Sequence, residues 1–407
     1  MKRFFKSYYN SCEKQYDVFN CFVEKAYSLL REGGKMGFVL PNRFLTNNDY
    51  KSFREFLLNN TKVNRVDDIG EGYFKDVSMP SLLLAIEKTN SPPNLDYNVQ
   101  VRVEIENLST MDWKEYEIPV SNFKKDSSYK INIYLPPELV NIADRMEENS
   151  DPFKKYLLNA RGVEIGKKHS IVSKIKSEDL MVPFLIGSDI SRYQIKNNHY
   201  IKLDEEEINY KTPNLYKGEK IIIRKTGKGI NATYDIKNHY VIQVIYILKL
   251  KDEFPDLPLL GFLAILNSKI MEWYYFIKFG EKDKKSFPHL RQSSILSLPM
   301  KEMEIRTKEY LNVLSKLAKI IIELGIKLNK TTYIDHEIID PLVYKLYIGN
   351  ETNDELLKYV KQVFSQFEAF TLQECAERIF QDKKLKNLVN KVNKEQNYIS
   401  INKFLSN

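Results

Sequence analysis

Apolar residues near the start of the chain recur at helical spacing. Residues 17–32 place apolar side chains three or four positions apart behind Asp17, which can cap a helix, and Gly33 can end it. A similar pattern predicts a second helix over residues 48–59. Both helices belong to the first 90 residues.

Short apolar runs between and after these helices predict strands over residues 36–40, 63–69 and 81–87. The first and last of these runs are continuously apolar, which is typical of strands that are buried on both faces of an α/β sheet. Three strands and two helices leave an apolar edge strand and half of one face open. The predicted sheet is therefore incomplete.

The rest of the chain changes pattern twice. Residues 91–130 are acidic and rich in Pro and Asn, and alternation over residues 99–106 predicts a hairpin strand in a connecting segment. Residues 151–300 mix short strands with one apolar helix, predicted over residues 259–279, as in an α+β domain. Apolar residues at three- and four-residue steps over residues 304–330 predict a long amphipathic helix, and further helices follow.

The charge lies unevenly along the chain. The net charge is only +8 over 407 residues, but residues 151–300 hold 25 Lys and Arg against 17 Asp and Glu. Such an excess suits a polyanion, because neutralised phosphates release counterions. Solvated surface lysines are the alternative.

The composition also indicates in which cellular compartment the protein is expected. The longest apolar run is too short to span a bilayer, and the N-terminus is too polar for a signal peptide, so we expect a cytoplasmic protein. The three cysteines are widely separated and odd in number, which favours reduced, structural thiols over disulfides or a metal site.

Three short motifs resemble catalytic or cofactor sites. Gly70-Glu71-Gly72 follows a strand, but a cofactor loop needs a helix after it, and the following residues predict a strand, so a hairpin turn is favoured. Ser91-Pro92-Pro93-Asn94 lacks the aromatic residue of amino-methylating enzymes. Asp256 and Asp283 echo the spacing of a metal-dependent nuclease only loosely, and the histidines are scattered. We therefore predict no catalytic, cofactor-binding or metal-ligating residue in this chain.

Residues 221–235, IIIRKTGKGINATYD, carry a different signal. An apolar strand runs into cations and two glycines, with a tyrosine close behind. Glycines let a backbone approach a phosphate, and cations supply charge, so this stretch is a candidate for contact with nucleic acid. A hairpin with solvated lysines is the alternative.

Taken in series, several stretches resemble the adenine-specific DNA methyltransferases of restriction-modification systems that carry a Taq-type C-terminal specificity domain. The early stretch YDVFNCFVEKAYSLLREGGKMGFVLPNRFL is similar to the residues that follow the catalytic Asn-Pro-Pro-Tyr in that family. RGVEIGKKHSIV, PFLIGSDISRY, KIIIRKTGKGINATYD and LLGFLAILNSKIMEWYY follow the order of the specificity domain. The resemblance covers roughly residues 4–347. The chain starts after the S-adenosylmethionine loop and the Asn-Pro-Pro-Tyr motif of the family.

The resemblance implies a fold class of α/β, as part of a Rossmann-like methyltransferase sheet, followed by an α+β target-recognition domain and a helical region. The expected domains are the C-terminal half of the methyltransferase sheet, a connecting segment, a DNA target-recognition domain and a helical tail, over residues 1–90, 91–150, 151–300 and 301–407.

The resemblance also implies site residues. Phe74, with Tyr73 second, matches the aromatic that packs on an adenine flipped out of the duplex. The expected DNA-binding residues are Lys167, Lys168, Arg192, Tyr193, Arg224, Lys225, Lys228, Lys284, Lys285 and Arg291.

The function expected from these observations is the DNA-recognition portion of a site-specific adenine methyltransferase. It would be inactive alone, with S-adenosylmethionine bound only in the complete enzyme. The expected partners are double-stranded DNA and a protein chain that supplies the N-terminal half of the methyltransferase domain. A non-enzymatic specificity or partner-binding subunit is the main alternative, and a metal-dependent nuclease is a third.

Overall fold

A computed structural model describes residues 2–12, 16–71, 79–89, 93–104, 113–125, 127–166, 171–176, 181–197, 199–203, 205–206, 208–227, 229–279, 289–325, 329–349, 354–367 and 369–406. Contacts divide this chain into two compact units, the first up to residue 140 and the second from residue 141 to the end. Each unit is described by itself.

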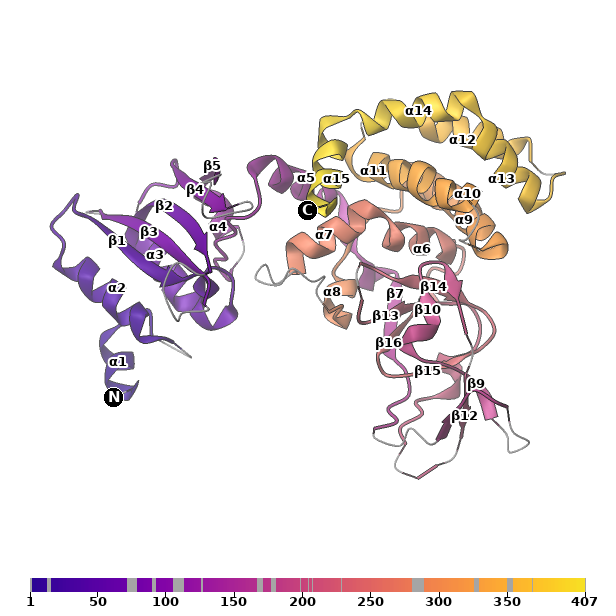
Figure 1. Cartoon of the computed structure of the whole chain (residues 1–407), viewed down its shortest axis with the longest axis horizontal. Helices are drawn as coiled ribbons and strands as arrows, with labels where there is room; N and C mark the ends of the chain where they lie inside the picture. Colours follow the sequence, from indigo (N-terminus) through magenta and orange to yellow (C-terminus); the bar gives the residue numbers. More distant parts are fainter. Residues whose placement is uncertain are drawn as a thin grey trace. The chain divides into compact units, whose positions relative to one another are not determined.

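The first unit is a five-stranded mixed sheet with short helices (Figure 1). The sheet order is β1-β3-β2-β4-β5, and the only parallel neighbours are β2 and β4. The strands are β1 (Lys35–Pro41), β2 (Thr61–Gly70), β3 (Ser81–Lys88), β4 (Asn98–Glu104) and β5 (Trp113–Pro119). The helices are α1 (Lys2–Tyr8), α2 (Val18–Leu29), α3 (Lys51–Asn60) and α4 (Ser121–Lys124). The helices and strands predicted for the first 90 residues are therefore confirmed.

The expected connecting segment is corrected by the sheet topology. Strands β4 and β5 form the predicted hairpin, but β4 also pairs with β2, so the hairpin completes the first sheet. The physical reason is the alternation in β4, where Val99, Val101 and Val103 are all buried against the sheet's core. A strand with apolar side chains on one face is stable where that face is buried, and in the first sheet the three valines join the apolar core of the unit.

One face of β1 and β3 remains open, as the incomplete sheet predicted. Val39 of β1 and Leu83 of β3 are register partners, and their side chains are 47% and 43% exposed. Their neighbours Phe38 and Leu84 pair on the other face, where Leu84 is buried. Within the described residues, β1 also has no strand on its outer side. The two strands are therefore not buried on both faces here, and a Rossmann-like sheet stays a prediction.

The second unit contains two four-stranded sheets that share an apolar core. One has the order β14-β13-β16-β7 and the other β15-β9-β12-β8. Ile222 and Ile245 from the first sheet pack with Phe184 and Ile201 from the second. The strands of the first sheet are β7 (Leu157–Arg161), β13 (Lys220–Arg224), β14 (Ala232–Asp235) and β16 (Ile245–Leu250). Those of the second are β8 (Val172–Ser173), β9 (Met181–Leu185), β12 (His199–Lys202) and β15 (Tyr240–Val241). Two-stranded pairs are formed by β10 (Ile190–Ser191) with β11 (Gln194–Ile195) and by β6 (Ser150–Pro152) with β17 (Pro299–Lys301).

Helices cover the first of these sheets in layers (Figure 1). The predicted single apolar helix over residues 259–279 is instead two helices, α6 (Leu259–Asn267) and α7 (Lys269–Phe279). The chain turns at Ser268, whose backbone is extended, and the amide of Lys269 donates to the carboxylate of Asp340 at 2.8 Å. The break depends on a residue from a distant helix, so hydropathy alone could not indicate it.

The long helix α9 (Ile305–Leu324) packs on α6, where a Cβ added at Gly261 would lie 2.6 Å from the carbonyl oxygen of Leu311. Gly325, with a φ of 78°, ends α9 before the predicted residue 330. The remaining helices are α5 (Pro137–Glu147), α8 (Gln292–Leu296), α10 (Asn329–Tyr333), the π-helix η7 (Ile334–Ile339), α11 (Asp340–Ile348), α12 (Glu355–Ser365), α13 (Leu372–Gln381), α14 (Lys383–Asn393) and α15 (Gln396–Ser406). The mixed α/β organisation with a helical C-terminal region is confirmed. Across the described helices, none has the length and apolar character needed to cross a membrane.

Candidate nucleic-acid interface

One edge of the β14-β13-β16-β7 sheet collects cations from separate parts of the chain. Strands β7 and β13 are both antiparallel to β16, so their carboxyl ends lie at the same edge. Arg161 is the last residue of β7, Arg224 is the last residue of β13, and Lys225 follows it. Side chains more than 60 positions apart in sequence thus reach one edge.

The segment before α8 joins the same edge through its backbone. The amide of Leu290 donates to the carbonyl of Lys225 at 3.0 Å, and the hydroxyl of Tyr246 donates to the carbonyl of Leu290 at 3.0 Å. Arg291, the next residue, is anchored by its amide, which donates to the hydroxyl of Tyr275 at 3.0 Å. We call Arg161, Arg224, Lys225 and Arg291 the cationic edge.

Two glycines, Gly187 and Gly227, lie beside the guanidinium of Arg224. A Cβ added at Gly227 would lie 3.8 Å from the guanidinium, and one at Gly187 would lie 4.0 Å from its Nε. The Nε of Arg224 is buried and has no hydrogen-bond partner within the described residues. A guanidinium carries five donors, so the terminal nitrogens of Arg224 are the groups that could meet an anion or a base edge.

The glycine hairpin after β13 approaches helix α7 closely. Gly229 has a φ of 73°, and a Cβ added there would lie 2.7 Å from the carboxylate oxygens of Glu272. A side chain at this position would be strained by its backbone conformation and would displace Glu272. The glycine in the predicted phosphate-contact stretch therefore has a packing role as well.

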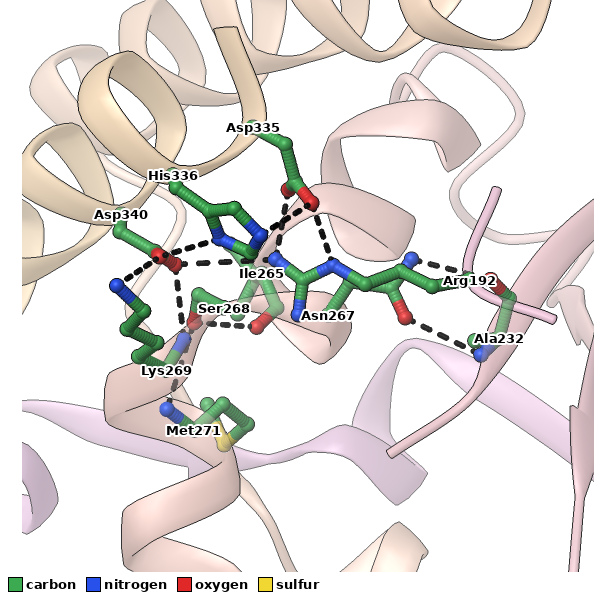
Figure 2. A network of polar contacts seen from close by, with 10 residues as sticks. All are labelled: Arg192, Ala232, Ile265, Asn267, Ser268, Lys269, Met271, Asp335, His336 and Asp340. Atoms are coloured by element: carbon green, nitrogen blue, oxygen red, sulfur yellow. Dashed lines mark hydrogen bonds and ion pairs between the residues drawn. The ribbon is translucent and has the colours of Figure 1, made fainter. Parts of the chain in front are cut away.

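Arg192 and Tyr193 do not belong to the cationic edge. Figure 2 shows Arg192 directed toward the π-helix η7, where its Nε and Nη2 donate to Asp335 at 2.7 and 2.6 Å. Burial by itself would lower the pKa of the guanidinium, but the carboxylates of Asp335 and Asp340 raise it above its ordinary value. The side chain of Tyr193 is buried. In this structure both residues lie inside the second unit, and their predicted contact with DNA stays a prediction.

Most of the other predicted site residues lie outside the described part of the chain. These are Tyr73, Phe74, Lys167, Lys168, Lys228, Lys284 and Lys285. The structure therefore brings together Arg224, Lys225 and Arg291 out of the predicted DNA-binding set.

Three polar residues at the cationic edge were missed by the sequence analysis. They are Arg161, Asn159 and Gln292, which form a chain of hydrogen bonds between β7 and α8. Arg161 opens the stretch RGVEIGKKHSIV, from which only the two lysines were selected. The sequence did hold a signal for Arg161, because it ends a strand just as Arg224 does.

The hairpin turn predicted at Gly70 and Gly72 stays a prediction, because Gly72 lies outside the described residues. Gly70 ends β2 with a φ of 68°, and it pairs with Ser81 at the start of the antiparallel strand β3. An S-adenosylmethionine site needs a strand, a glycine loop and a helix in succession. Among the described residues, no strand is followed by a glycine loop and a helix, and the absence of an S-adenosylmethionine site stays a prediction.

Among the described residues, no three or more His, Cys, Asp or Glu side chains are grouped so that they could hold a metal ion. The three cysteines are free and buried.

Two family models match this chain. The TaqI-like C-terminal specificity domain matches residues 182–300, which include three members of the cationic edge. The Eco57I restriction-modification methylase matches residues 1–74. The predicted resemblance to methyltransferases of restriction-modification systems with a TaqI-like specificity domain is therefore confirmed.

Known relatives agree with these matches. The chain is 27% identical over 372 residues to a putative type II restriction enzyme and methyltransferase of Methanocaldococcus jannaschii, covering 85% of this chain and 31% of the relative. It is 32% identical over 87 residues to the type II restriction enzyme and methyltransferase RM.Eco57I of Escherichia coli, covering 21% of this chain and 9% of the relative. The chain thus spans less than a third of the length of either relative.

A solved structure shares the fold. The type IIL restriction-modification enzyme MmeI in complex with DNA has a TM-score of 0.51 and 10% identity, covering 92% of this chain and 55% of that chain.

Proposed function

We propose that this chain is the DNA-recognition portion of a site-specific, adenine-specific DNA methyltransferase of a restriction-modification system. The observation that carries the proposal is the cationic edge, three of whose four residues lie within the region matched by the specificity-domain model. The reaction would be transfer of a methyl group from S-adenosylmethionine to the amino group of an adenine in a short duplex site.

The cationic edge suits duplex DNA because it combines two kinds of cation. Lys225 can neutralise a phosphate as a point charge, whereas the arginines carry planar guanidinium groups that can bind two acceptors at once. Guanine presents such a pair of acceptors, O6 and N7, in the major groove. Phosphate contacts would position the protein, and arginine contacts to bases would select the site.

The catalytic half is proposed to come from residues outside the printed sequence. What supports this is that the 407 residues contain no Asn-Pro-Pro-Tyr. The free edge of β1 would receive the remaining strands of the methyltransferase sheet by backbone pairing, and the elements that accompany them would cover the exposed face with Val39 and Leu83. These strands would belong either to a longer polypeptide or to a second chain.

The target adenine would be held by the connection between β2 and β3. Phe74, with Tyr73 second, would stack on the base after it leaves the duplex, which recovers part of the energy of unstacking. Both residues lie outside the described part of the chain.

The first test is duplex binding measured as a function of salt. We expect the double variant Arg224→Ala/Lys225→Ala to weaken binding at least tenfold and to reduce the slope of log K against log salt by about two. The matched control is Lys154→Ala/Lys217→Ala, because these exposed lysines precede β7 and β13 at the opposite edge of the same sheet. Absence of duplex binding by the unaltered chain at low salt would refute the proposal.

The second test concerns catalysis. The chain alone, given S-adenosylmethionine and a duplex library, is expected to leave adenine unmethylated, and addition of a segment with the donor loop and Asn-Pro-Pro-Tyr should restore methylation. Methylation by the chain alone would contradict the proposed division of the enzyme. DNA binding without any restored methylation would favour a non-enzymatic specificity subunit, and magnesium-dependent cleavage would favour a nuclease.

A further inference from the structure

Asn159, Gln292 and Arg161 form a linear series of hydrogen bonds at the cationic edge. The Nε of Arg161 donates to the Oε1 of Gln292 at 3.0 Å, and the Nε2 of Gln292 donates to the Oδ1 of Asn159 at 3.1 Å. Asn159 and Arg161 lie two positions apart in β7, and Gln292 is the first residue of α8. A strand and a helix therefore hold one arginine between them.

The orientation of the Gln292 amide follows from the chemistry of arginine. A guanidinium has donors but no acceptor, so the oxygen of Gln292 must face Arg161 and its NH2 group must face Asn159. The segment before α8 is itself held in place, because the amide of Leu290 donates to the carbonyl of Lys225, the residue that follows β13. Gln292, which is bonded to both β7 and the Arg161 side chain, thus holds the Nε of Arg161 in a position set by the strand and the helix.

This arrangement occupies only one part of the guanidinium. The Arg161 side chain is exposed, and its two terminal nitrogens have no hydrogen-bond partner among the described residues. The nearby carboxylate of Glu164 is engaged by Lys211 at 2.7 Å. Arg161 therefore keeps two terminal nitrogens available beside an Nε that is already bonded, whereas an arginine without such a bond would lose more side-chain freedom on binding.

We propose that Arg161 is a specificity-determining residue that reads a guanine edge in the target duplex, with Gln292 and Asn159 as positioning residues. The proposal rests on the proposed function. Two parallel guanidinium donors match the acceptors O6 and N7 of guanine. A guanidinium held in one orientation suits such a base contact, which requires that orientation, better than a phosphate contact, which is possible in many orientations. The region matched by the specificity-domain model begins after Arg161, so that comparison does not assign this residue.

The test begins with selection of preferred duplexes from a randomised library by the unaltered chain, followed by dissociation constants for each single-base-pair change. Arg161→Lys keeps the charge and removes the fork. We expect it to abolish discrimination at one G·C pair, which for a bidentate contact is about 5- to 150-fold, while discrimination at the other positions and the salt slope stay unchanged.

Two variants of Gln292 distinguish a role in positioning Arg161 from a role in stabilising the fold. Gln292→Leu removes the acceptor for Arg161 and is expected to reduce discrimination at the same G·C pair. Gln292→Glu keeps a carboxyl oxygen in that place and is expected to restore most of it. Lys154→Ala, at the opposite edge of the sheet, should change no base preference, and urea unfolding checks that all variants are folded.

The outcomes distinguish this inference from the proposed function. A loss of affinity in Arg161→Lys that is uniform across sequences, or no loss at all, overturns the reading role while leaving DNA recognition by the chain intact. Equal effects of Gln292→Leu and Gln292→Glu overturn the positioning role. Failure of the unaltered chain to select any sequence overturns the proposed function itself.

Discussion

Arg192 and Asp335 form a buried, two-pronged ion pair between parts of the chain that are 143 positions apart. Arg192 lies in the turn between β10 and β11, and Asp335 lies in the π-helix η7 (Figure 2). Asp340, 3.9 Å from the same guanidinium, also accepts the amide that begins α7. One polar network therefore joins the β10–β11 turn to three helices of the second unit, η7, α11 and α7.

Removing one member of this pair should destabilise the second unit strongly. Arg192→Met leaves the carboxylate of Asp335 buried without its partner, and we expect a loss of about 3 to 5 kcal/mol in the free energy of unfolding. Urea denaturation of the second unit measures it. The double variant Arg192→Met/Asp335→Leu should recover part of the loss, because it removes both charges. A loss below about 1 kcal/mol in the single variant would show that the pair does not hold this region.

A second buried network should make stability depend on pH. Asp235 bonds to Lys220 at 2.7 Å and to His239 at 2.8 Å. Burial by itself would raise the pKa of Asp235, but the hydrogen bonds from His239 and Lys220 hold it below its ordinary value of 3.8. Because the folded state favours the ionised carboxylate, its contribution is present above the pKa of the unfolded chain and is lost as the pH falls through the folded pKa.

The comparison that tests this pH dependence is between the unaltered chain and Asp235→Asn. The difference in unfolding free energy should be largest near pH 6 and should shrink as the pH falls toward about 3, because the protonated acid then resembles the amide. A difference that is constant over this range would contradict the assignment.

Gly162 should tolerate no side chain. A Cβ added there would lie 1.9 Å from the carbonyl oxygen of Val241, and the neighbouring amide of Val163 already bonds to that oxygen at 2.7 Å. We expect Gly162→Ala to destabilise the second unit by about 2 kcal/mol or more, since backbone must move to admit the methyl group. Gly187→Ala is the control, because its nearest contact would be an ordinary 3.6 Å. Equal thermal midpoints for the two variants would disprove the close approach.

Phe74→Ala should weaken a reconstituted methyltransferase without changing its affinity for S-adenosylmethionine. The proposed role of the ring is to stack on the extruded adenine, so its loss affects only the DNA complex. Equilibrium binding of the methyl donor and the rate of methylation, measured on the same preparation, separate the two effects. A changed donor affinity with an unchanged rate would place Phe74 elsewhere.

The open face of the first sheet should matter for assembly more than for folding. Val39→Lys/Leu83→Lys alters two half-exposed side chains that are register partners, so the unfolding free energy of the first unit should change little. The same variant should block association with the remaining methyltransferase strands, because two charges would be buried there. Leu95→Lys, which changes another exposed leucine of this unit, is the control. Normal association of the double variant would exclude this face as the docking surface.

Local patterning predicted much of the fold. The helices and strands of the first 90 residues follow from apolar spacing, because burial of one helix face or of a strand interior is encoded by neighbours in sequence. Where the partner is distant, the same method failed. The apolar run over residues 259–279 predicts one helix, yet the structure has two. The side chain of Asn267 bonds to the backbone of Ala232, and the carboxylate of Asp340 accepts the amide of Lys269, where the second helix begins.

The sequence by itself determined the resemblance to restriction-modification methyltransferases, the order of elements and the stretch that holds Arg224 and Lys225. Only the tertiary structure decided which cations gather at one edge of a sheet and which pair with buried carboxylates. Arg192 and Arg224 are the same residue type, but a carboxylate 143 positions away engages Arg192, whereas Arg224 ends a strand at the cationic edge. Hydrophobic periodicity is a local property, whereas the partner of a charge is set by the folding of the whole unit.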